Sequence, residues 1–170
     1  MATGLKKSSE VINIGFQVTE SGPNTFTQGS IDLNLDPLNN EVFVVLAINL
    51  DPFIPSSLAG VDTRVAASLT TTSQTALASL ADANCLARAA HQIQAAGFVD
   101  GGVAFTQLST ETPTANLDYI GIIATNDFFV QVEGAGNPVA KGVSGKLYGY
   151  RAKASAATYA ALVQSEVLSS

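Results

Sequence analysis

The sequence is poor in charge, and the charge it has is mostly acidic. Only 13% of its 170 residues are charged, about half the usual share for a soluble domain. Lys and Arg together number 8 and Asp and Glu 14, which gives a formal net charge of -6. A general nucleic-acid-binding protein needs a basic face that displaces counterions, so this balance argues against that class. A surface with so few charges suits a protein that copies or partners largely cover.

Reactive side chains are also scarce. Cys85 is the only cysteine, which excludes an intramolecular disulfide, and its context favours a small buried hydrophobic residue over a reactive thiol. His91 is the only histidine, so no histidine cluster can bind zinc. No Gly-x-Ser-x-Gly motif supplies the nucleophile of a serine triad. We therefore expect no catalytic residue, no metal site and no cofactor, and a protein that is not an enzyme and takes no small-molecule substrate.

Two segments imitate ligand-binding loops without completing them. Residues 32–36 (DLNLD) resemble the start of a calcium loop, but Pro37 stands at the glycine position and Phe43 at the position of the bidentate glutamate. Their alternation favours a strand, and a surface calcium ion at the adjoining turn is the alternative. Residues 134–138 (GAGNP) lack the third glycine of a dinucleotide fingerprint, so we predict a hairpin connection there.

No segment has the properties of a signal peptide or a membrane-spanning helix. Lys6 and Lys7 are not followed by an apolar core of signal-peptide length. The longest apolar run, Val42 to Ile48, is far shorter than the roughly 20 residues that a transmembrane helix needs. We expect a soluble protein that is not secreted.

The dominant local pattern is that of β-strands. Apolar and polar residues alternate, or β-branched residues run together, in eight segments separated by turn residues: 11–19, 25–35, 42–50, 63–72, 98–109, 117–125, 128–133 and 143–153. The run Val42 to Leu50 is apolar almost throughout, which predicts a strand buried on both faces. Asn126 and Asp127, between two of the segments, predict a tight hairpin turn.

Two other segments have helical spacing. Between residues 75 and 96 the apolar residues fall near one stripe, which predicts an internal helix over 75–96 that ends at Gly97: Leu77, Leu80, Ala83, Ala87, Ala90 and Ile93. Ser155 is placed to cap a C-terminal helix over 155–168, whose apolar face would comprise Tyr159, Leu162, Val163 and Val167.

Together these elements predict a mainly β protein. About eight strands with no regular alternation of strand and helix favour an antiparallel β-sandwich of jelly-roll type, with one internal helix and a C-terminal helix. We expect residues 1–170 to form a single domain of this kind, with residues 1–10 as an N-terminal arm.

The C-terminal strand carries an unusual share of the basic residues. Four of the eight cations lie between Lys141 and Lys153. Lys146, Tyr148 and Tyr150 would share one face of the strand, with Arg151 on the other. Such a face could meet nucleic acid, anionic lipid or an acidic neighbour, and a solvated edge strand protected by lysines is the alternative. Because the rest of the chain is acidic, we favour contact between subunits, through Lys141, Lys146, Tyr148, Tyr150, Arg151 and Lys153.

The stretch from Val143 to Ala154 (VSGKLYGYRAKA), which runs into Tyr159 to Val163 (YAALV), is similar to the C-terminal ends of viral coat proteins. With its strand layout and low charge, the chain resembles the single jelly-roll capsid proteins of tailless icosahedral DNA viruses of archaea and bacteria. The resemblance implies a homo-oligomeric capsid subunit that tiles an icosahedral shell, in some cases with a second coat protein. It implies synthesis in the host cytoplasm and a place in the virion, where an internal membrane or the genome is a further candidate contact.

Two other functions fit the same pattern. The first is a phage decoration or tail-associated protein, which would share the β-sandwich and the lack of catalytic motifs. The second is a carbohydrate-binding β-sandwich module. The absence of tryptophan and the presence of only four tyrosines count against it, because such modules usually display exposed aromatic rings.

Overall fold

A computed structural model describes the chain except for residues 1–3, 98, 100–101, 109–117 and 169–170. The described part contains ten strands, a short 3-10 helix at Pro37–Asn39 between the third and fourth strands, and one α-helix, α1 (Ala156–Leu168), after the last strand. The strands are β1 (Leu5–Lys7), β2 (Ile12–Thr19), β3 (Thr27–Asp32), β4 (Glu41–Pro52), β5 (Thr63–Thr70), β6 (Cys85–Gln94), β7 (Val103–Leu108), β8 (Gly121–Ile123), β9 (Asp127–Ala135) and β10 (Gly142–Ala154). Each of the eight segments expected to be extended overlaps one of these strands.

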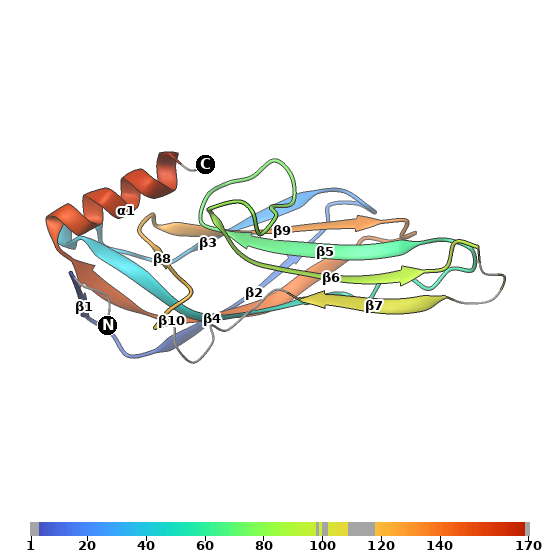
Figure 1. Cartoon of the computed structure of the whole chain (residues 1–170), viewed down its shortest axis with the longest axis horizontal. Helices are drawn as coiled ribbons and strands as arrows, with labels where there is room; N and C mark the ends of the chain where they lie inside the picture. The colour runs from blue at the N-terminus through green and yellow to red at the C-terminus, as the bar shows by residue number, and fades with distance from the viewer. Residues whose placement is uncertain (1–3, 98, 100–101, 109–117, 169–170) are drawn as a thin grey trace.

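The strands form two five-stranded antiparallel sheets (Figure 1). Sheet A has the order β1-β10-β4-β8, and β2 pairs with β10 beside β1. Sheet B has the order β3-β9-β5-β6-β7. The N-terminal arm expected over residues 1–10 thus contributes a strand, because Leu5–Lys7 pair with the end of β10.

The pairing of the strands is that of a jelly roll. With β1 and β7 set aside, the first strand pairs with the last, β2 with β10, and the next two pairs are β3 with β9 and β4 with β8. The innermost pair is β5 with β6. Eight strands nested in this way, with alternate pairs assigned to opposite sheets, make the double-sheet roll, so the predicted fold class is confirmed.

The inward faces of the two sheets make the main core. Phe43, Ile48 and Leu147 of sheet A meet Phe128, Val130 and Leu69 of sheet B, and all are fully buried. The Phe16 and Phe128 rings meet edge to face, with centroids 5.7 Å apart. The expected burial of β4 on both faces is confirmed at its start, where Val42 and Val44 lie in a second cluster on the outer face of sheet A.

The internal helix predicted over 75–96 is wrong. Residues 71–84 form an irregular loop, and Cys85–Gln94 form strand β6, which pairs with β5 and β7. The alanines of this segment satisfy two periods at once, since Ala87 and Ala89 point into the core two residues apart while Ala87 and Ala90 suit a helix. Backbone pairing on both sides of β6 outweighs the high helix propensity of alanine.

Both predicted hairpin turns are also wrong. Asn126 lies between β8 of sheet A and β9 of sheet B, and Asp127 is the first residue of β9, so the chain changes sheets there. Residues 134–138 likewise lead from β9 of sheet B to β10 of sheet A. Sequence signals for a tight turn do not reveal whether the following strand pairs with the preceding strand or crosses to the facing sheet.

Residues 71–84, here called the loop cover, fold back over the outer face of sheet B. The Ala78 amide donates to Ser68 Oγ at 3.2 Å, and the Gln74 amide donates to Gln28 Oε1 at 2.8 Å. Beneath them lies Gln131, which is fully buried. Its Oε1 accepts from Ser68 Oγ at 2.7 Å and its Nε2 donates to Thr70 Oγ1 at 2.8 Å and to Gln28 Oε1 at 2.9 Å.

Helix α1 covers part of the outer face of sheet A, at the end where β1 and β8 lie (Figure 1). The predicted C-terminal helix and its cap are confirmed, since the Thr158 amide donates to Ser155 Oγ at 3.3 Å. Tyr159, Leu162 and Val163 pack on the second cluster, whereas Val167 is mostly exposed. The helix thus explains why the outward side chains at the start of β4 are as apolar as the inward ones.

Candidate assembly surfaces

The exposed outer face of sheet A carries two of the six predicted contact residues. Lys146 is exposed on β10, opposite Gly15 of β2 and Asn49 of β4. Tyr148 follows on the same face, half-buried, opposite Asn13 and Ala47. The neighbours of Lys146 and Tyr148 are small and neutral, so these two side chains project from a surface that is otherwise uncharged. A partner that covered this surface would desolvate only one charged group.

Tyr150 lies farther along the same face, in the apolar cluster that helix α1 covers. It packs against the second apolar cluster, and the Lys7 ammonium lies 5.2 Å from the centroid of its ring. A cation at that distance from a ring is a favourable contact within the subunit. Tyr150 therefore has a structural role whatever else it contacts.

Arg151 is occupied inside the subunit. Its Nη2 donates to the Leu33 carbonyl at 2.8 Å, and its Nε lies 3.6 Å from Glu41 Oε1. Its backbone amide donates to Ser9 Oγ. The guanidinium thus ties sheet A to the segment after β3, and little of it is left to meet a neighbour.

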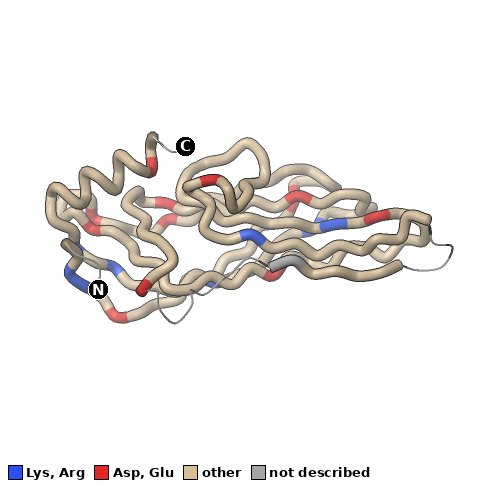
Figure 2. The backbone as a smooth tube through the Cα atoms, viewed as in Figure 1, with Lys and Arg blue, Asp and Glu red and all other residues tan. Residues whose placement is uncertain are grey.

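The two remaining predicted contacts lie at opposite ends of β10. Lys153 is exposed beside Lys6 of β1 and Glu41 of β4, and Lys141 precedes the strand, where its amide donates to Glu20 Oε1 at 2.8 Å. The six residues therefore do not form one patch. Figure 2 shows charges scattered along the chain, without a continuous basic band.

Glu20 and Asn137 close the end of the sandwich near Lys141. Glu20 is buried and its carboxylate also accepts from the Thr25 and Gly134 amides, at 2.8 and 2.9 Å. The Asn137 side chain accepts from the Ser56 amide and donates to the Arg64 carbonyl. These two buried polar side chains are hydrogen-bonded to backbone groups of strands and loops, so they hold this end of the sandwich together.

His91 is the nearest approach to a catalytic arrangement. It lies on β6, with Nδ1 3.1 Å from Thr106 Oγ1 and Nε2 3.9 Å from Asp51 Oδ1. The second distance is too long for a hydrogen bond, and the Asp51 side chain is 82% exposed. The carboxylate therefore does not orient the imidazole, which a histidine acting as a general base requires.

The other reactive group and the acidic residues give no site either. Burial raises the pKa of the Cys85 thiol, and the nearby charge of Asp82 adds to the rise. A backbone hydrogen bond at Ala87 and the charge of Arg88 lower the pKa by less. Among the described residues, no three His, Cys, Asp or Glu side chains gather where they could hold a metal ion. No helix in the described part of the chain is long and apolar enough to cross a membrane.

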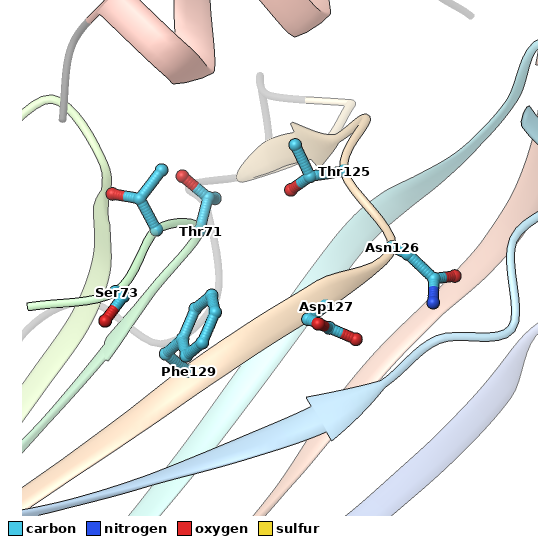
Figure 3. A pocket seen from close by; sticks show the side chains of 7 residues that line it. Thr71, Ser73, Thr125, Asn126, Asp127 and Phe129 are labelled. Carbon is cyan, nitrogen blue, oxygen red and sulfur yellow. The ribbon is translucent and has the colours of Figure 1, made fainter.

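A cleft of about 240 Å³ opens between the end of β5 and the start of β9, and sequence reasoning missed it. Four hydroxyl side chains, one amide, one carboxylate and one aromatic ring line it: Thr71, Thr72, Ser73, Thr125, Asn126, Asp127 and Phe129. The Asn126 amide is already bonded to Asp32 and to the Leu35 backbone, and Figure 3 shows it turned away from the Phe129 ring. The antiparallel pairing of β5 with β9, which sets Thr70 opposite Phe129, brings these distant segments together, so no local motif could have predicted the cleft.

No family model matches the sequence, and no curated protein matches it either. One solved structure with a similar arrangement is a chain from desmodium yellow mottle tymovirus, with 16% sequence identity. The alignment covers 86% of this chain and 87% of that one, with a TM-score of 0.31. A TM-score of that size is too low to establish a common fold.

Proposed function

We infer that this protein is a structural subunit of a virus shell, a capsid protein that associates with copies of itself. The observation that carries the proposal is the complete nested pairing of a jelly roll, which is the architecture of many capsid subunits as well as of lectins and cupins. The step from fold to function is an analogy. The sparse charge and the hydrogen-bonded, buried Glu20 support the proposal, because shell subunits must bury much of their surface without leaving charges unpaired.

In the finer form of the proposal, the subunit tiles an icosahedral shell of a tailless virus of archaea or bacteria, alone or with a second coat protein. It would be made in the host cytoplasm and reside in the virion. Contact of the basic strand with an internal membrane or the genome is part of the same proposal. A decoration or tail-associated protein would share the subunit fold but would bind to a shell or tail built by other proteins.

The native mass of the untagged protein tests the proposal. Light scattering over a range of protein and salt concentrations should give trimers, pentamers, hexamers or heavier particles, which imaging would then resolve. The proposal of a shell subunit is contradicted if the protein stays a strict monomer at every concentration and also fails to join assembled virus particles. Binding only to preformed particles would indicate a decoration protein.

Lys146 and Tyr148 are the residues that we propose as subunit contacts on the outer face of sheet A. Charge reversal in Lys146→Glu should lower the yield of particles and leave the subunit folded, because the side chain is exposed. Lys6→Glu makes the same charge change on the short strand β1 and serves as the control. Arg151 is unsuitable for this test because its loss would break contacts inside the subunit.

A carbohydrate-binding module is the second candidate, and the cleft beside Phe129 is the observation that favours it. A half-buried ring surrounded by hydroxyl groups can stack against a sugar and bond to its hydroxyls. Titration with a panel of mono- and oligosaccharides should then show binding that Phe129→Ala removes. No binding at millimolar sugar concentrations would leave this candidate without support.

A further inference from the structure

Strand β7 is one of the two edge strands of sheet B. Its backbone pairs with β6 on one side only in the described part of the chain. Residues 103–106 are all exposed, and Val103 and Phe105 each keep 46% of their surface accessible. The strand reads VAFTQL, without a charge or a proline. An edge of this kind carries unpaired N–H and C=O groups that invite another strand.

The other long edges of the sandwich expose less apolar surface than β7 or carry a charge. On β2 the inward residues Ile14, Phe16 and Val18 pack on the main core, and the outward residues Asn13, Gly15 and Gln17 are polar or small. The β3 edge ends in the charge of Asp32. Folded proteins usually guard an exposed edge with charge, proline or a covering segment, and the described residues of β7 show none of these.

An apolar hollow of about 280 Å³ adjoins the edge. Ile54, Pro55, Ile93, Ala104 and Phe105 line most of it, and Ile54 is 75% exposed. Strand β8 pairs with β4 only over Phe43–Val45, so in the described part of the chain no strand pairs with the rest of that side of β4. The edge therefore combines unpaired backbone with apolar side chains, and a partner strand would bury both.

We propose that β7 pairs antiparallel with β7 of a second copy about a twofold axis, so that the two B sheets form one continuous sheet. An extended, uncharged strand fits this edge, and the β7 strand of a second copy is such a strand. Each copy carries a net charge of -6, so two copies repel least where they meet through neutral surface. Twofold contacts of a patch with itself are the commonest form of protein self-association.

The inference rests on the self-association in the proposed function, but it does not depend on a virus shell. A dimer through β7 is a complete assembly by itself, and it would also be a building block of larger particles. The two ideas can therefore fail separately.

Cysteine crosslinking tests the pairing directly. In an antiparallel pair, residues beside the twofold axis face their own copies with Cα atoms about 4.5–5.5 Å apart, within the range that a disulfide spans. In a Cys85→Ser background, single cysteines would replace Val103, Ala104, Phe105 and Thr106 in turn, and mild oxidation would be followed on non-reducing gels. We expect rapid dimer formation at one or two adjacent positions and slow formation at the others.

The control for chance collisions is Val139→Cys, an exposed apolar position in a loop between β9 and β10. Equal crosslinking at all four strand positions and at the control would overturn the proposal. So would rapid self-crosslinking of Asn13→Cys on β2 in place of the β7 positions, because it would identify the other edge as the contact.

Charge placed on the edge gives a second measurement that does not depend on oxidation. Phe105→Lys should weaken the dimer about tenfold or more in sedimentation equilibrium, because pairing would bury the new ammonium group. Val139→Lys should leave the dissociation constant unchanged, and thermal unfolding of both variants checks that they fold. A dimer that never grows larger but loses affinity in Phe105→Lys supports this inference and contradicts the shell. Heavier particles that are insensitive to Phe105→Lys and show no β7 crosslink support the shell and contradict this inference.

Discussion

The two sheets have their outer faces covered in chemically opposite ways. Over sheet B, the loop cover is held by side-chain hydrogen bonds that converge on the fully buried Gln131. Over sheet A, helix α1 is held by apolar contacts to Val42 and Val44 and by one buried carboxylate, that of Glu166. Glu166 accepts from the Ala124 and Thr125 amides, at 2.7 and 3.1 Å, and from the Thr125 hydroxyl at 2.8 Å.

The two covers should therefore respond differently to amino-acid substitution. A buried polar network stabilises only when every member is satisfied, because each unpaired group costs its desolvation energy. An apolar contact is less directional, so the helix could shift slightly on the sheet at small cost, and Glu166 supplies the hydrogen bonds that determine its position. The covers meet where Asn84 Nδ2 lies 3.5 Å from the Glu166 carbonyl.

The largest effect is expected at the centre of the loop cover. Gln131→Leu preserves the size of the side chain but leaves Ser68 Oγ, Thr70 Oγ1 and the Gln28 amide without their shared partner. We expect a loss of about 2–3 kcal/mol in the free energy of unfolding, measured by urea denaturation. Gln17→Leu makes the same replacement at an exposed position of β2 and should change it by less than about 0.5 kcal/mol. Equal stabilities for the two variants would refute the importance of the network.

A smaller and more local effect is expected at the helix cover. Glu166→Gln presents an amide N–H₂ group to backbone donors that now meet a carboxylate, at a cost of about 1–2 kcal/mol. Because the apolar contacts and the main core remain, the loss should show as faster hydrogen exchange in α1 and at residues 124 and 125. The exposed Glu10→Gln is the matched control. Uniformly faster exchange across both sheets would show instead that the helix is needed for the whole sandwich.

The smallest effect concerns Cys85, at the end of the loop cover. Because burial raises the pKa of its thiol, the reactive thiolate is scarce near neutral pH. Alkylation at pH 7.5 should therefore be roughly tenfold slower than for an unfolded control in urea. Gln131→Leu should speed the reaction by loosening the loop cover. A folded protein that reacts as fast as the unfolded one would contradict this account of the burial of Cys85.

Much of the strand content and the C-terminal helix could be predicted from local pattern. Period-two alternation in Ile12–Thr19 and the run at Val42–Val45 survive in the structure, because the burial of those side chains follows directly from which faces are apolar. The capping serine at position 155 also acts over three residues, within the reach of local sequence. The scarcity of charge, and the presence of a single cysteine and a single histidine, are likewise properties that no folding step can alter.

Only the tertiary structure decided matters that depend on distant partners. The alanines of β6 suit a helix or a strand, and pairing with β5 and β7 determined the outcome. Contacts with distant segments also gave Lys146 and Arg151 different surroundings. Lys146 is exposed, whereas Arg151 donates to the Leu33 carbonyl. It also left β7 at an open edge, which its own six residues could not reveal. Strand pairing joins residues that are far apart along the chain, so no short stretch of sequence determines which strands become neighbours.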